Sequence, residues 1–291
     1  MIKNVTIDLH MHSTVSDGTD TPSEIVRCVM EHGIGLFSLT DHDAIKGCDT
    51  VKAHLAEKKA EGMEVPDFIS GIEFSCKDEL GKYHILGYGY DAATAPIRNV
   101  VEKGHSLRMK KVLGRLEFLK EEFGFEYSQE DLDELLSLDN PGKPHIGNLM
   151  VKYGYADDKE VAIRSYIDKK KFGSVYIRPE EAIKGILGSG GIPVLAHPVY
   201  GSGDQFIIGE ELEERVTRLM GFGLQGVEAY YSGFTAPMIK SVLLLASRYE
   251  LCVTAGSDYH GSNKLVVLGD TNFKGERPKE MERFLEEVKI R

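Results

Sequence analysis

The chain of 291 residues lacks tryptophan, contains four cysteines, and has no apolar stretch long enough to span a membrane. None of the cysteines (Cys28, Cys48, Cys76 and Cys252) are in CxxC spacing, so neither a zinc ribbon nor a redox pair is indicated. We expect them to be small buried or half-buried thiols. Without an apolar run of about 18 residues, no membrane span is expected. The first residues also lack a signal-peptide pattern, so the cytoplasm is the expected compartment.

Positive charge is in deficit as well. The chain has 35 Lys and Arg residues against 46 Asp and Glu residues, a formal net charge of −11. Proteins that follow a long nucleic-acid backbone usually present a basic face, so long nucleic acid is not an expected partner. A small anionic ligand remains compatible, because bound cations can reverse the sign of charge locally. Neither the length nor the charge predicts an oligomeric state.

Short β-type runs alternate with helical patterns. The clearest helix begins at Thr21, which fits the N-cap position, with Pro22 in the first turn and Glu24 completing a capping box. Alternating strands and helices favour a parallel sheet, and seven strands favour a closed barrel over a doubly wound sheet. The predicted strands are Thr6–His12, Leu36–His42, Phe68–Phe74, His84–Tyr90, Ile192–Pro198, Gly226–Tyr231 and Cys252–Asp258.

One interval breaks this alternation. About a hundred residues separate the strand that ends near Tyr90 from the strand that begins near Ile192, far more than an ordinary crossover needs. The pattern between them is helical, notably over Leu107–Phe123 and Gln129–Leu138. We therefore predict a barrel domain formed by residues 1–96 and 172–291, with residues 97–171 as a helical insertion that covers the active-site face.

Polar side chains follow the first strand in alternation. Asp8, His10 and His12 occupy every second position, so a pleated strand would point all three to one side. Two histidines at this spacing can bind one metal ion, and Asp8 could orient one of them. By itself an HxH pair is a weak signal, since a surface strand can carry one by chance.

The signal gains strength because similar residues recur at other strand edges. In barrels, functional residues gather at the carboxyl ends of the strands. Six of the ten histidines here lie at strand edges, either end included, near a carboxylate or another histidine. Mixed imidazole and carboxylate ligands suit Mn²⁺, Fe²⁺ or Zn²⁺ better than Ca²⁺ or Mg²⁺. The residues concerned are His10, His12, Asp17, His42, Glu73, His84, His197, Asp258 and His260.

These motifs, taken in order, resemble the PHP family, named for polymerase and histidinol phosphatase. The resemblance implies a distorted (β/α)7 barrel of the α/β class with two or three divalent ions, most often Mn²⁺. The matching segments are Asp8-Leu9-His10-Met11-His12, Ser16-Asp17-Gly18, Leu39-Thr40-Asp41-His42-Asp43, Gly71-Ile72-Glu73, Ala196-His197-Pro198 and Gly256-Ser257-Asp258-Tyr259-His260-Gly261.

The resemblance also implies how the ligands are shared. His10, His12, Glu73 and Asp258 would hold the first ion, and Glu73 would bridge to a second ion held with His84 and His197. Asp17, His42 and His260 would hold the third. A phosphate ester would then be hydrolysed by a hydroxide that bridges two metals. Asp258 is the expected partner for the proton of the attacking water, and His197 or His260 could protonate the leaving oxygen.

Substrate choice must come from other residues. The segment Gly142–Asn148 resembles the part of the family that acts on nucleoside 3′,5′-bisphosphates, AMP-like esters or the 5′ ends of short RNA. Lys143 stands where that subgroup carries Arg, and it keeps the charge but not the bidentate fork. We predict that Lys143, His145 and Arg178 contact the substrate, although each could instead be a surface or helix-start residue.

Two alternatives remain open. A histidinol-phosphate phosphatase would share the metal ligands but would need a pocket for an amino alcohol. A catalytically inactive regulatory module is the alternative of another class, and it is disfavoured because such modules lose ligands while all nine expected ligands are present here.

Overall fold

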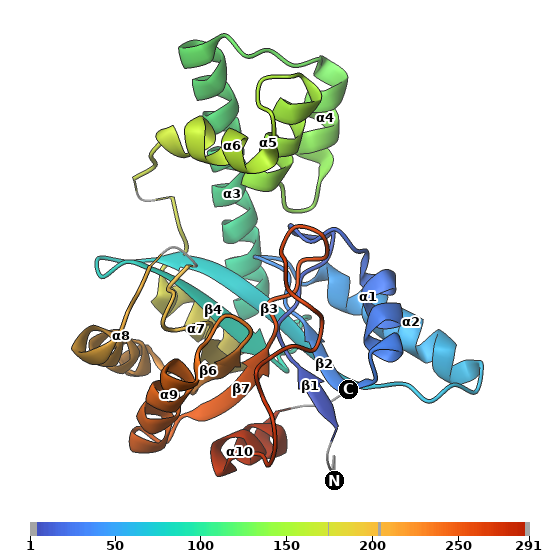
Figure 1. The fold of residues 1–291 in the computed structure, drawn as a ribbon, viewed down its shortest axis with the longest axis vertical. Coiled ribbons are helices and arrows are strands. Elements are labelled where there is room, and N and C mark those ends of the chain that lie inside the picture. Colours follow the sequence, from blue (N-terminus) through green and yellow to red (C-terminus); the bar gives the residue numbers. More distant parts are fainter. Residues whose placement is uncertain (1–4, 174, 203–204, 289–291) are drawn as a thin grey trace.

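The computed structural model describes residues 5–173, 175–202 and 205–288. At its centre lies a seven-stranded sheet whose strands follow one another in sequence order (Figure 1). The amide of Leu9 donates to the carbonyl of Ala255 at 2.9 Å, and that of Asp258 donates to the carbonyl of His10 at 2.8 Å, so the sheet closes beyond the first and last strands. The predicted distorted barrel is confirmed. The strands are β1 (Thr6–Asp8), β2 (Ile34–Leu39), β3 (Asp67–Lys77), β4 (Lys82–Tyr88), β5 (Ile192–Leu195), β6 (Gly226–Tyr231) and β7 (Cys252–Gly256).

The sheet is not parallel throughout, and on this point the sequence-based expectation is wrong. Strand β4 runs antiparallel to both β3 and β5, while the remaining neighbours pair in parallel. A tight turn joins β3 to β4, in which the amide of Asp78 donates to the carbonyl of Gly81 at 2.9 Å. Because β4 is reversed, its first residues lie at the edge where the parallel strands end. This reversal brings His84 to the same edge as the strand-end histidines.

Most of the parallel strands are shorter than predicted. Strand β1 ends at Asp8, so His10 and His12 follow the strand and do not belong to it. Similarly, β5 ends at Leu195 before His197, and β7 ends at Gly256 before Asp258. The functional segments are therefore loops at the barrel mouth, fixed by single backbone bridges such as the one between Met11 and Tyr259.

Within the described part of the chain, six helices besides α3 (Ala95–Phe123) pack around the barrel. The predicted capping box is present at the first of them, where the hydroxyl of Thr21 accepts from the amide of Glu24 and the Glu24 carboxylate accepts from the amide of Thr21. Apolar faces of these helices, with residues such as Val26 and Val51, pack against the outer side of the sheet. The helices are α1 (Pro22–Glu31), α2 (Lys46–Ala60), α7 (Pro179–Gly188), α8 (Gly209–Phe222), α9 (Ala236–Arg248) and α10 (Lys279–Glu287).

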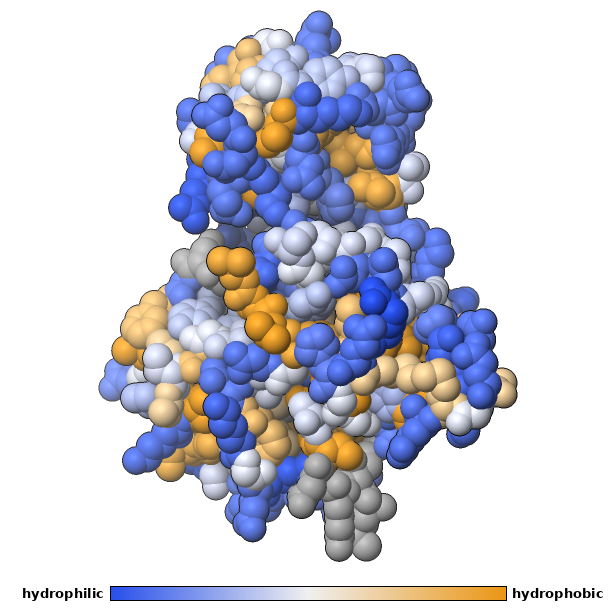
Figure 2. All heavy atoms as spheres, turned by 45° about the vertical axis from the view of Figure 1, so that its right-hand side comes forward, coloured by the Kyte–Doolittle hydropathy of each residue, from blue (hydrophilic) through white to orange (hydrophobic). Residues whose placement is uncertain are grey.

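Most of the interval between β4 and β5 forms a helical lobe, with a constriction between the lobe and the barrel (Figures 1 and 2). The lobe has its own apolar core, which includes Val112, Leu119 and Ile146. By contrast, Ile97 and Val100, in the first turns of α3, pack into the barrel core. The division at residues 97–171 stays a prediction, and α3 serves both parts. Besides α7, the helices of this interval are α3 (Ala95–Phe123), α4 (Gln129–Ser137), α5 (Lys143–Lys152), α6 (Lys159–Ser165) and the short 3₁₀ helix η1 (Ile167–Lys169).

No helix within the described residues is long and apolar enough to cross a membrane.

Candidate metal centre and its cavity

The carboxylate of Glu73, on β3, is the centre of the polar cluster. Five histidines from four separate segments point at its two oxygens, and the carboxylate is only 1% exposed. The nitrogen–oxygen distances are 3.3 Å from Nε2 of His10, 3.1 Å from Nε2 of His12, 3.1 Å from Nδ1 of His42, 2.9 Å from Nδ1 of His84 and 3.3 Å from Nε2 of His197. No single carboxylate can satisfy five imidazoles by hydrogen bonding, so this arrangement is typical of a site built for cations.

Asp17 and Asp258 provide the other carboxylates that face these rings. Oδ1 of Asp258 lies 3.5 Å from Nε2 of His10 and 3.4 Å from Nε2 of His12. Oδ1 of Asp17 lies 3.4 Å from Nε2 of His260. The rings of His12 and His260 stack with their centroids 4.0 Å apart, so the segments that follow β1 and β7 belong to one cluster.

The side-chain atoms of this cluster fit divalent ions. Seven of them are buried and have no hydrogen-bond partner among the described residues, although buried polar atoms are normally paired. Two or three bound ions would satisfy these atoms. The atoms are Nε2 of His10, Nε2 of His12, Oδ1 of Asp17, Nδ1 of His42, Oε2 of Glu73, Nδ1 of His84 and Nδ1 of His197.

Four overlapping groups bring their donor atoms within 4.8 Å of one another: His12, Asp17, His42 and His260; His10, His12 and Glu73; His10, His197 and Asp258; and His42, Glu73 and His84. The first contains the set expected for a third ion, with His12 added. The second lies within the set expected for the first ion. The last two differ from the expected sharing, since His197 groups with His10 and Asp258 and not with His84. All nine expected ligands are therefore brought together, while their assignment to individual ions stays a prediction.

Glu228, on β6, contacts two of the histidines, His10 through its ring and His197 through its backbone amide. Its Oε1 lies 3.0 Å from Nδ1 of His10, and its Oε2 accepts the amide of His197 at 2.8 Å. A carboxylate on Nδ1 directs Nε2 of His10 toward the cluster. Burial opposes a charge on His10, but Glu228, Glu73 and Asp258 outweigh it and raise the pKa of His10 well above its usual value.

Asp8 supports the backbone and not a histidine ring, contrary to the role considered from the sequence. Its carboxylate accepts the amides of Ser257 at 2.9 Å and Gly269 at 2.8 Å. Burial raises the pKa of Asp8 to about 6, although these hydrogen bonds act in the opposite direction. Asp8 thus ties the first strand to the loop after β7.

Two of the predicted ligands have a left-handed backbone that side chains other than glycine rarely adopt. The φ angle is +26° at His197 and +60° at Asp258. Such conformations cost free energy and persist only where the surroundings impose them. Here the amide of Asp258 is held by the carbonyl of His10, and the amide of His197 by Glu228. The backbone conformation of these two residues therefore lowers the stability of the fold while it sets the direction of their side chains.

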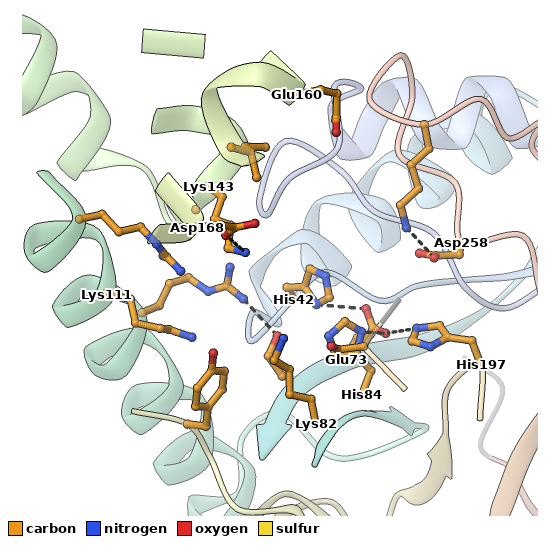
Figure 3. A pocket seen from close by; sticks show the side chains of 18 of the residues that line it. His42, Glu73, Lys82, His84, Lys111, Lys143, Glu160, Asp168, His197 and Asp258 are labelled. Atoms are coloured by element: carbon orange, nitrogen blue, oxygen red, sulfur yellow. Dashed lines mark hydrogen bonds and ion pairs between the residues drawn. The ribbon is translucent and has the colours of Figure 1, made fainter. Parts of the chain in front are cut away.

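A cavity of about 620 Å³ opens from the cluster toward the helical lobe (Figure 3). Six of its lining side chains are Lys or Arg and four are Asp or Glu, so the cavity is relatively cationic although the whole chain carries a formal charge of −11. The cations are Lys82, Arg108, Lys111, Arg115, Lys143 and Lys264, and the carboxylates are Glu73, Glu160, Asp168 and Asp258.

The three residues predicted to contact substrate lie in different surroundings. Lys143 lines the cavity and forms an ion pair with Asp168. His145 accepts the amide of Gly142 at 3.0 Å through Nδ1, which is the helix-start role considered as its alternative. Arg178 is not among the cavity-lining residues, and its guanidinium pairs with Glu79 at 3.0 Å. The structure therefore gives no support to substrate contact by Arg178.

The sequence reasoning missed three cations of helix α3. Arg108, Lys111 and Arg115 are spaced by three and four residues, so they share one helix face, and all three line the cavity. Arg108 donates to Asp43 at 2.6 Å, which ties α3 to the segment that follows β2. Their helical spacing is readable in the sequence, but only the packing of α3 on the barrel shows that this face looks at the metal cluster.

Comparison with known proteins agrees with this geometry. Relatives include a 5′-3′ exoribonuclease of Haemophilus influenzae, 27% identical over 90% of this chain and 92% of its own length. A 3′,5′-nucleoside bisphosphate phosphatase of Chromobacterium violaceum is 28% identical over 87% of each chain. A phosphoribosyl 1,2-cyclic phosphate 1,2-diphosphodiesterase of Eggerthella lenta is 31% identical over 87% of this chain and 94% of its own length.

A solved structure from Bifidobacterium adolescentis, named as a metal-dependent phosphoesterase, superposes with a TM-score of 0.78 over 97% of this chain and 96% of its own, at 24% identity. The family profile of the PHP domain matches residues 8–177, from the first aspartate through the helical lobe. With the buried histidine and carboxylate groups at the barrel mouth, this match places the chain in the PHP domain family of metal-dependent phosphoesterases.

Proposed function

We propose that this enzyme hydrolyses a phosphate monoester of a nucleotide, either a nucleoside 3′,5′-bisphosphate or an AMP-like ester, or acts on the 5′ end of short RNA. One observation carries the proposal: the cavity has a cluster of metal-type ligands at one end and a cationic face of α3 at the other. A simple monoester needs only the first end. A substrate with a second phosphate uses both.

The charge of the far wall supports a second anion. Lys111 lies with its ammonium 4.4 Å from the centre of the Tyr176 ring, and Arg108 and Arg115 lie on the same helix face. Burial, followed by repulsion from Arg108, lowers the pKa of Lys111 to about 8. Nearby cations thus destabilise one another, and a phosphate between them would relieve that repulsion.

The volume of the cavity suits such a substrate. At about 620 Å³ it falls within the range of roughly 300–1,000 Å³ that is common for small-molecule sites. Long nucleic acid is not favoured as a partner, because the chain as a whole is acidic, with a formal net charge of −11.

The described side chains can then be given roles. The barrel-mouth histidines, with Asp17, Glu73 and Asp258, would hold two or three divalent ions, for which Mn²⁺ is our first candidate and Fe²⁺ or Zn²⁺ are alternatives. Bound ions would supply an activated water and offset the charge of the phosphoryl oxygens. Lys143 and the α3 cations would orient the substrate through the phosphate that is not cleaved. Asp258, His197 and His260 remain our candidates for proton transfer.

A panel of phosphate esters assayed with Mn²⁺ tests the proposal, and Lys143→Ala sharpens it. Loss of a hydrogen bond to a charged group costs about 1.5–3 kcal/mol, so kcat/KM for a nucleoside 3′,5′-bisphosphate should fall about ten- to a hundredfold. The rate with p-nitrophenyl phosphate, which has no second phosphate, should barely change. Lys143→Arg should retain the bisphosphate rate, because Arg can also replace the pair with Asp168.

Two results would argue against this assignment. An equal fall in both rates would mean that Lys143 serves the reacting centre or the fold. No fall in either rate, with a better rate on histidinol phosphate or on a cyclic ribose phosphate, would move the substrate to one of those esters. Turnover of no ester by protein shown to contain metal would favour the inactive regulatory module.

A further inference from the structure

The two carboxylate oxygens of Asp258 have different surroundings. Oδ1 faces Nε2 of His10 and Nε2 of His12, at 3.5 and 3.4 Å, on the side of the metal cluster. Oδ2 accepts two hydrogen bonds, one from the hydroxyl of Tyr231 at 2.9 Å and one from the ammonium of Lys264 at 2.6 Å. Asp258 therefore stands between the metal ligands and a lysine that the family resemblance did not point to.

The loop that carries Lys264 is held without help from its side chain. The side-chain amide of Asn263 donates to the carbonyl of Asp17 at 2.7 Å and accepts from Lys159 of α6. The amide of Ser262 donates to the hydroxyl of Thr19 at 2.9 Å. The lysine side chain is 41% exposed and is anchored through its ammonium at Asp258. Such a side chain can turn to a new partner while its backbone stays in place.

The position of Lys264 in the cavity indicates which group its ammonium would contact instead of Asp258. Lys264 lines the same cavity as Glu73, His84 and the α3 cations. In Figure 3, Asp258 lies on the opposite side of the cavity from Lys111. A phosphate held at the metal cluster would therefore have the α3 cations on one side and the ammonium of Lys264 on the other.

Loss of the Lys264 contact would cost Asp258 little free energy. If Lys264 turns away, Oδ2 keeps the hydrogen bond from Tyr231, so the buried carboxylate is not left without a donor. In return, the ammonium gains a phosphoryl oxygen, and hydrogen bonds between two charged groups are among the strongest in proteins.

We propose that Lys264 is a catalytic residue whose ammonium leaves Asp258 and donates a hydrogen bond to a non-bridging oxygen of the phosphate that is hydrolysed. The contact carries charge only, and no proton is transferred. The inference rests on the phosphoesterase activity but not on the choice of a nucleotide as substrate. Inorganic phosphate, the product of every monoester, is therefore a sufficient probe.

Binding of inorganic phosphate to the Mn²⁺-loaded full chain, measured by calorimetry, tests this role. Lys264→Met should weaken phosphate binding about tenfold or more, and Lys264→Arg should keep most of the affinity. Lys240→Met, at an exposed lysine of α9, makes the same change in net charge and should leave phosphate affinity unchanged. Elemental analysis should find the metal content of all three variants equal to that of the wild type.

Either of two results overturns the proposal. Wild-type phosphate affinity in Lys264→Met means that the ammonium does not reach the phosphate. A loss of metal together with phosphate means that Lys264 acts only by holding Asp258. Lys264→Gln repeats the test should the methionine variant fail to fold. A failure of the nucleotide proposal would appear in the ester panel and leave this measurement unaffected.

Discussion

The two ends of the cavity differ in how firmly their side chains are held. At the barrel end, His10 and His12 are fully buried, and Glu228 fixes the ring of His10 at 3.0 Å. At the lobe end, Lys143 is 39% exposed and its charge is paired with that of Asp168, which is 36% exposed. The reacting end is thus preformed by the barrel, whereas the proposed recognition end includes a partly exposed cation held by one ion pair. Under the proposed function, the chemistry and the choice of substrate depend on separate residues.

Removal of metal should produce the largest effect, since it disables the preformed end altogether. Chelation should abolish hydrolysis of both a bisphosphate and p-nitrophenyl phosphate, and added Mn²⁺ should restore both. The seven buried atoms of the cluster that lack a hydrogen-bond partner are the reason, because bound cations would satisfy them. Full activity in protein shown by elemental analysis to be metal-free would contradict the proposed centre.

Substitution of a ligand should come next. His10→Ala and Asp258→Asn should each lower kcat by at least about 10²–10³, the cost of a lost electrostatic contact at a reacting centre, and by more if an ion is lost. The fall should be the same for both esters, because these residues belong to the end that every substrate uses. Cooperative thermal unfolding is the control for the fold. Wild-type turnover in either variant would remove that residue from the ligand set.

A smaller effect is expected from substitution of Glu228, which contacts predicted ligands but is not one of them. Glu228→Gln keeps the shape but weakens the hold on His10 and on the amide of His197, and substitution of such supporting groups typically costs about 10- to 100-fold in metal affinity or activity. Titration with Mn²⁺ should show weaker binding, and excess Mn²⁺ should recover part of the rate. A loss of rate at unchanged metal affinity would place Glu228 in a different role.

The smallest effect concerns the recognition end and depends on pH. The pKa of Lys111, lowered to about 8 by burial and by Arg108, means that its charge is present below that pH and is lost above it. The preference for a bisphosphate over p-nitrophenyl phosphate should therefore decline by up to about tenfold as the pH rises through this value. Lys111→Arg, which stays charged, should give a flat ratio. A wild-type ratio that is flat over the same range would exclude Lys111 from phosphate binding.

Much of the reacting end could be predicted from the sequence. The ligand types, their spacing around His10 and His12 and their recurrence at strand edges depend on local order along the chain. The capping box at Thr21 could be predicted for the same reason, since all its partners lie within four residues. Such features can be predicted without knowledge of how distant segments pack.

The recognition end could not be predicted in the same way. Arg178 was a reasonable candidate by charge, yet it pairs with Glu79, while Arg108 and Lys111 face the cavity from a helix that crosses from barrel to lobe. A surface cation has many possible neighbours, and local sequence does not choose among them. The choice depends on the direction of α3.

Two further features depended on the fold. The reversed direction of β4 brings His84 to the edge of Glu73, and the closure of β7 on β1 brings Asp258 to His10 and His12. Residue order determined which chemical groups this protein has and which of them lie next to each other along the chain. Strand direction and barrel closure decided which distant groups meet, because contacts between segments far apart in sequence are set by packing the whole core.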